Sequence, residues 1–114
     1  MMTPFHLYLY GPSRGPIATS FEEVEQRLTK IDQLYFEPDG SFVWSGKGGQ
    51  EQVFGMVYDA GGQVQYCELR GRCQRKHWRL LYQAIAGTAT EGLEVLLLPI
   101  QQLQDLQTFE ESLD

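Results

Sequence analysis

The chain has 114 residues, a length typical of one folded domain, and 42% of them are hydrophobic and 12% aromatic. Its charged fraction of 21% is ordinary for a globular surface and argues against a disordered chain. The net charge of −6 at pH 7 argues against broad binding to nucleic acid or to an anionic membrane, because the long-range attraction has the wrong sign. We therefore expect a single domain over residues 1–114.

The composition also bears on the compartment. The N-terminal residues lack the basic segment and long apolar run of a signal peptide, and no run of 18 apolar residues occurs in the sequence. Two cysteines, Cys67 and Cys73, are too few for the disulfide framework of a small secreted domain. We expect a cytoplasmic protein with reduced thiols and no membrane-spanning segment.

The first predicted element is a strand over residues 5–10, where Leu7 and Leu9 alternate with aromatic residues. A segment rich in Gly and Pro, 11–16, ends this strand. Because successive side chains of a strand point to opposite faces, the pattern predicts one aliphatic and one aromatic face.

A helix is predicted over residues 21–31. Ser20 and Glu23 have the spacing of a capping box, in which the hydroxyl accepts the Glu23 amide and the Glu23 side chain reaches back. Apolar residues follow at helical spacing, and acidic residues gather at the positive N-terminal end.

Two β-hairpins are predicted next, from turn residues between short apolar runs. Residues 37–40, Glu-Pro-Asp-Gly, place proline second and glycine where φ must be positive. Residues 59–62, Asp-Ala-Gly-Gly, follow the same logic. These turns predict four consecutive antiparallel strands: 34–37, 41–45, 53–58 and 63–70.

The last third of the chain predicts a helix over 74–86 with Gly87 as its C-terminal cap, a strand over 93–98 and a final helix over 100–113. The whole order is strand, helix, four strands, helix, strand, helix. This order predicts an α+β fold, with an antiparallel or mixed six-stranded sheet and helices packed on it.

A cluster of positive charge is the most unusual feature of the sequence. It spans the end of the strand at 63–70 and the first turns of the helix at 74–86. Cations at a helix N-terminus oppose the helix dipole, so their placement here is locally unfavourable. It is expected to be compensated by a function or by contacts with residues distant in the sequence. One hypothesis is a site for an anion or an acidic partner. The alternative is pairing with the chain's own acids, such as Glu68, Glu91, Glu94 or the Glu110/Glu111 pair. Five of the nine Lys and Arg residues form the cluster: Arg70, Arg72, Arg75, Lys76 and Arg79.

Cys73 and Arg79 have the Cys-x5-Arg spacing of phosphatases that attack phosphate with a cysteine. The helix start and the neighbouring arginines would lower the pKa of the Cys73 thiol. Against catalysis, the intervening residues include no glycine for a tight loop, and no general acid is identified. Zinc at Cys67, Cys73 and His77 is also disfavoured, because the paired Cys-x2-Cys spacing is missing. No cofactor motif and no metal site are predicted.

The strands are unusually rich in aromatic residues on both faces, where a sheet with one wet face should alternate more cleanly. Either helices cover both faces, or one face docks a partner or a second copy of the chain. Tyr8, Tyr10 and Tyr35 are the candidate surface aromatics. In the two strands between residues 53 and 69, five side chains are expected to share one face of the sheet: Phe54, Met56, Tyr58, Val64 and Tyr66.

These patterns favour a small non-enzymatic module that binds another protein, or itself, through an aromatic sheet face or the Arg70–Arg79 cluster. The alternative is an anion- or phosphate-binding domain centred on the start of the helix at 74–86, with Cys73 and Arg79 as its catalytic candidates. The two hypotheses differ in what they require of the thiol: only the second needs a reactive Cys73.

Overall fold

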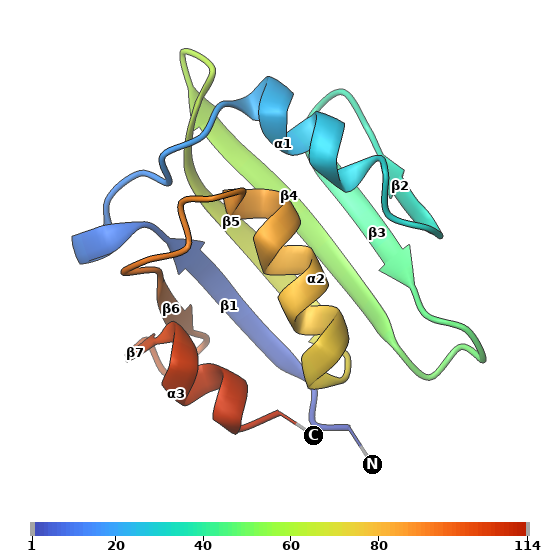
Figure 1. The fold of residues 1–114 in the computed structure, drawn as a ribbon. Helices are drawn as coiled ribbons and strands as arrows, with labels where there is room; N and C mark the ends of the chain where they lie inside the picture. Colours follow the sequence, from blue (N-terminus) through green and yellow to red (C-terminus); the bar gives the residue numbers. More distant parts are fainter. Residues whose placement is uncertain (1, 114) are drawn as a thin grey trace.

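The computed structural model describes residues 2–113, which form one antiparallel sheet of seven strands, three α-helices and a short 3-10 helix (Figure 1). The sheet order is β2-β3-β4-β5-β1-β6-β7. The predicted α+β fold is confirmed, with one strand more than the six expected. The elements in chain order are β1 (Phe5–Tyr10), η1 (Pro12–Arg14), α1 (Phe21–Leu28), β2 (Leu34–Phe36), β3 (Ser41–Ser45), β4 (Gln52–Ala60), β5 (Gln63–Arg72), α2 (Arg75–Ala86), β6 (Glu94–Leu97), β7 (Gln102–Asp105) and α3 (Leu106–Glu111).

The helices gather on one side of the sheet, where Figure 1 shows α1, α2 and α3 in front of the strands. The ring of Phe5 on β1 contacts Trp78 of α2 and Phe109 of α3, with centroids 5.8 and 5.6 Å apart. Leu7 and Leu9 are fully buried beneath the helices. Among residues 2–113 no helix lies on the opposite side, which we call the open face. Of the two expectations for the strands, coverage of both faces is therefore wrong.

The local signals for α1 and for both hairpins are confirmed. The Ser20 side chain accepts the Glu23 amide, and the Glu23 carboxylate accepts the Ser20 amide at 3.0 Å. The helix ends at Leu28, three residues earlier than expected. In the first hairpin the Gly40 amide donates to the Glu37 carbonyl at 3.0 Å, with φ of 95° at Gly40.

α1 and α2 are joined by Arg27, whose guanidinium lies at the C-terminal end of α2. Its Nε donates to the Ala84 carbonyl at 2.6 Å and its Nη2 to the Ile85 carbonyl at 2.9 Å. The last carbonyls of a helix lack partners within the helix and carry partial negative charge, so a cation there is favourable. Arg27 thereby holds the two helices together above the sheet.

The prediction of one helix over 100–113 is wrong in its first half. Residues 102–105 form β7, in which Leu103 pairs with Leu96 of β6. The chain turns into α3 only at Asp105, whose carboxylate accepts the Thr108 amide at 2.7 Å. None of the helices in the described range is long and apolar enough to span a membrane.

Candidate functional site on the open face of the sheet

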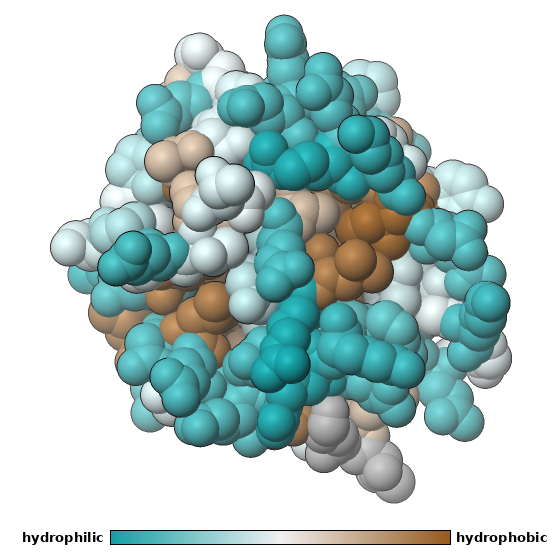
Figure 2. Space-filling view, viewed as in Figure 1, coloured by the Kyte–Doolittle hydropathy of each residue, from teal (hydrophilic) through white to brown (hydrophobic). Residues whose placement is uncertain are grey.

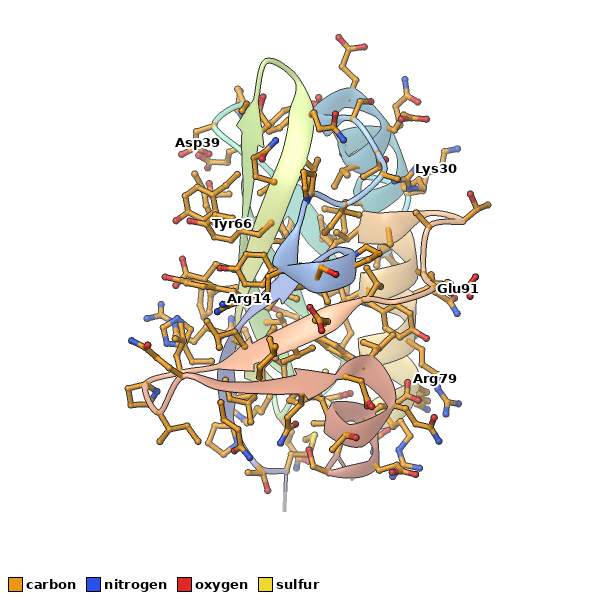
Figure 3. All side chains as sticks on the ribbon, turned by 90° about the vertical axis from the view of Figure 1, so that its left-hand side faces the viewer. Arg14, Lys30, Asp39, Tyr66, Arg79 and Glu91 are labelled. Carbon is orange, nitrogen blue, oxygen red and sulfur yellow. The ribbon has the colours of Figure 1, made fainter. Side chains whose placement is uncertain are left out.

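Four tyrosines from three adjacent strands form the centre of the open face. Tyr58, Tyr66 and Tyr10 lie in one row across β4, β5 and β1, with ring centroids 4.6 Å apart for the first pair and 5.4 Å for the second. Tyr8 lies beside them, 5.0 Å from Tyr66. Figure 3 shows the sheet from the side, with Tyr66 pointing away from the helices. The row is a continuous aromatic surface made of half-buried side chains.

Glu68 connects the tyrosine row to His6 through hydrogen bonds. His6 Nε2 lies 2.7 Å from one carboxylate oxygen, and the Tyr58 hydroxyl donates to the other at 3.2 Å. Partial burial and the nearby Glu68 carboxylate raise the pKa of Tyr58, which keeps its hydroxyl protonated as a donor. Glu68 thus links a side chain of β1 to a side chain of β4 across β5.

The open face carries charged side chains of both signs. His6 and Arg70 are register partners on β1 and β5, and the Arg70 guanidinium lies 5.6 Å from the centroid of the Phe54 ring. Glu94 of β6 is the register partner of Tyr10, and its carboxylate accepts the Arg14 amide at 2.8 Å. Asp39 lies on the same side of the sheet as Tyr66, as Figure 3 shows.

Large apolar side chains lie exposed around the tyrosines. Tyr35 at the β2 edge is 74% exposed, Phe54 is 44% exposed and Leu103 at the β7 edge is 43% exposed. Exposed apolar side chains also occur elsewhere: Leu80 of α2 is 45% exposed and Ile100 is 69% exposed. The helix side accordingly shows hydrophobic areas on either side of a hydrophilic central band (Figure 2).

One member of the set expected to share a face, Val64, lies on the other side of the sheet from Tyr66. Val64 is fully buried in the core rather than exposed beside Tyr66. The register of β4 and β5 shifts between Tyr58 and Asp59, which is a β-bulge. An extra residue in one strand reverses the side to which the following side chains point. The prediction assumed strict alternation through this turn.

The positive cluster predicted at Arg70–Arg79 is divided among different neighbourhoods. Arg70 lies on the open face, whereas Arg79 of α2 makes a two-pronged pair with Glu110, at 2.8 and 3.2 Å. Arg75 donates to the carbonyls of Glu111 and Leu113 at 3.4 and 3.0 Å. Arg72 Nε donates to the Gln50 carbonyl at 2.7 Å, so three members of the cluster, Arg72, Arg75 and Arg79, donate to acceptors of the chain itself. Lys76 lines one hollow and Arg70 another.

The start of α2 is held by a buried carboxylate that the sequence did not point to. Glu51 is 8% exposed, and one of its oxygens accepts the Gln74 amide at 2.7 Å and contacts His77 Nδ1 at 2.7 Å. The His77 ring lies 4.9 Å from that of Trp44 and borders a hollow of about 410 Å³. An anion of the chain thus takes the position that an external phosphate would need.

The Cys73 thiol is not activated, which corrects the expected direction of its pKa. Cys73 is 1% exposed, and burial together with the nearby Glu51 carboxylate raises its pKa to about 12. At neutral pH the side chain is therefore a thiol rather than a nucleophilic thiolate. Burial also raises the pKa of Cys67. Within residues 2–113 no group of three or more His, Cys, Asp or Glu side chains is arranged to hold a metal ion.

Comparison with known proteins finds no match for the chain among the family models, the curated proteins or the solved structures.

Proposed function

We propose that this protein is a non-enzymatic binding module that docks another protein on the open face of its sheet. The observation that carries this proposal is the tyrosine row with its exposed apolar surroundings on a face that no helix of the described chain covers. Tyrosines bury much area at low cost in conformational entropy and provide a hydroxyl for hydrogen bonding, so they are enriched in protein interfaces. Action in the cytoplasm stays a prediction.

The size of the open face suits a protein partner better than a small ligand. Six spacings of about 4.8 Å separate the seven strands, and three same-face positions about 6.7 Å apart lie along a strand. The region from Tyr35 to Leu103 therefore has a flat area of about 600 Å². Side-chain relief enlarges the accessible area, and a standard interface buries about 800 Å² per partner. A hollow of about 330 Å³ beside Phe54, Glu68 and Arg70 covers only part of this face and is at the low end of the size range of small-molecule pockets.

The anion-binding alternative has less support. The Gln74 amide at the start of α2 already donates to the Glu51 carboxylate, and Arg79 already donates to Glu110. The catalytic version would need a reactive thiol, and the raised pKa of Cys73 opposes this.

The experiment is site-specific photo-crosslinking from the two sides of the molecule. A photoreactive phenylalanine analogue replaces Tyr66 on the open face in one variant and Gln83, an exposed residue of α2, in the control. We expect a discrete protein adduct from position 66 alone. The adduct partner, identified and purified, should then bind the wild-type chain and lose at least tenfold in affinity when Tyr66 is replaced by serine. Equal adducts from both positions, or none from position 66, would refute the proposal.

A further inference from the structure

We propose that a cavity between the start of β1, the turn from β6 to β7, and α3 binds a small, neutral and largely apolar molecule that carries one hydroxyl group. The cavity has a volume of about 510 Å³. It lies at the end of the sheet where α3 ends beside the start of β1 (Figure 1). This inference goes beyond the proposed function, because it adds a second site and a different class of ligand.

Apolar side chains form most of the wall of this cavity. Phe5 of β1 and Phe109 of α3 line it with their rings edge to face, 5.6 Å apart, and Leu97 of β6 lines it as well. Ile100 also lines the cavity and is 69% exposed, so the apolar wall continues to the solvent. The volume falls within the range of about 300–1,000 Å³ that is typical of small-molecule sites, whose walls are mostly apolar.

The composition of the lining favours a neutral ligand. Within residues 2–113, the residues that line the cavity include no Lys, Arg, Asp or Glu. His6 is part of the lining, but its Nε2 already lies 2.7 Å from the Glu68 carboxylate. A charged ligand would therefore leave water without gaining an ion pair in the cavity, which is unfavourable.

One polar side chain of the lining has an unpaired atom. Gln104 of β7 lines the cavity, and its Oε1 is buried with no hydrogen-bond partner in the described part of the chain. Ser112, another polar residue of the lining, differs because its hydroxyl donates to the Phe109 carbonyl. A carboxamide both donates and accepts hydrogen bonds, and so does a hydroxyl. A ligand hydroxyl can therefore pair with either end of the Gln104 carboxamide, whose last side-chain torsion is broad.

The strand that carries Gln104 orients its polar and apolar residues in the reverse of the usual way. Gln104 is the register partner of the fully buried Val95, so its side chain points to the helix side of the sheet, where α3 packs. The neighbouring Leu103 points to the open face and is 43% exposed. A strand with one buried side normally turns its apolar residue inward, and departures of this kind are typical of functional positions. A ligand hydroxyl accounts for a polar residue at this inward position.

The test compares two probes, 4-propylphenol and propylbenzene, which differ only in the hydroxyl group. NMR titration of methyl groups gives the dissociation constant of each probe. Both probes should shift the methyl signals of Leu97 and Leu113, which line the cavity, and leave those of Val24 in α1 unchanged. In Gln104→Met the ratio of the two dissociation constants should change about fivefold in favour of propylbenzene, because only the phenol loses a hydrogen bond.

The matched control is Gln102→Met, the same substitution at an exposed residue of β7 that does not line the cavity, and it should leave the ratio unchanged. A measurement on wild type needs no variant: the ring of bound 4-propylphenol should give an NOE to the Gln104 side-chain amide. If 4-propylphenol at about 1 mM shifts neither Leu97 nor Leu113, the site is wrong. If the NOE is absent, or if Gln104→Met folds and keeps the wild-type ratio, the pairing with Gln104 and the ligand class inferred from it are overturned.

Discussion

Replacing Glu51 with alanine should destabilise the fold strongly, because its side chain lies at the start of α2 on the helix side of the sheet. Its carboxylate is 8% exposed and accepts the Gln74 amide at 2.7 Å while contacting His77 Nδ1 at 2.7 Å. The Gln74 side chain makes no cap hydrogen bond, so Glu51 acts as the cap of α2 in its place. Loss of this side chain leaves the first turn of α2 without its anion.

The magnitude follows from these contacts. A hydrogen bond to a charged group contributes about 1.5–3 kcal/mol, and an anion at a helix N-terminus about 0.3–1 kcal/mol. The alanine variant no longer has to bury a carboxylate on folding, and this gain offsets part of the lost stabilisation. We therefore expect Glu51→Ala to lower the free energy of unfolding by about 2–3 kcal/mol. For a domain of this size that corresponds to a fall in Tm of about 10 °C.

Urea unfolding followed by circular dichroism measures the effect. Glu25→Ala serves as the matched control, because Glu25 is an exposed carboxylate on α1. Glu51→Gln should cost less than Glu51→Ala, since its amide oxygen can still accept the Gln74 amide. If Glu51→Ala and Glu25→Ala fall within about 0.5 kcal/mol of each other, the capping role assigned to Glu51 is wrong.

Three other predictions test the core and the local signals. Gly55→Ala should destabilise by about 1–3 kcal/mol, because a Cβ would approach a ring atom of Phe42 to 2.0 Å, and Phe42→Leu should restore part of the loss in a thermal melt. Stability should fall by up to about 1.4 kcal/mol per pH unit above pH 9 for Cys73 alone, because its folded pKa is about 12 and only the unfolded state releases the proton in this window. Iodoacetamide labelling of Cys73 at pH 8 should therefore follow global unfolding rather than a fast native reaction. Ser20→Ala should cost about 1 kcal/mol by removing the hydroxyl that caps α1, and a loss below the error of chemical denaturation would contradict the capping box.

The predictions that succeeded concern interactions between residues close together in the sequence. The capping box of α1 and the turn at Gly40 depend on bonds across three residues, so the residue types alone determine them. The strand at 102–105 was missed for the opposite reason. Leu103 fits helical spacing with Leu106, yet pairing with Leu96 decides its conformation.

The candidate site was predictable only in part. Tyr8 and Tyr10 could be assigned to one face from alternation, but the side that the helices cover depends on long-range packing. The Glu51–His77 contact joins residues 26 positions apart, and neither stands in a recognisable motif. The arginine cluster looked continuous because its members are close in sequence. A strand followed by a helix sends such side chains in different directions.

The position of β1 has a consequence for how the chain folds. This first strand lies between β5 and β6, with Phe5 opposite Gly71 and Leu7 opposite Leu97. During synthesis β1 therefore has no pairing partner until β5, and later β6, has been made. Closing such long loops is slow, whereas the β4–β5 hairpin can form locally at once. We expect that hairpin to fold early and the N-terminal strand to insert late, joining the two ends of the chain in the middle of the sheet.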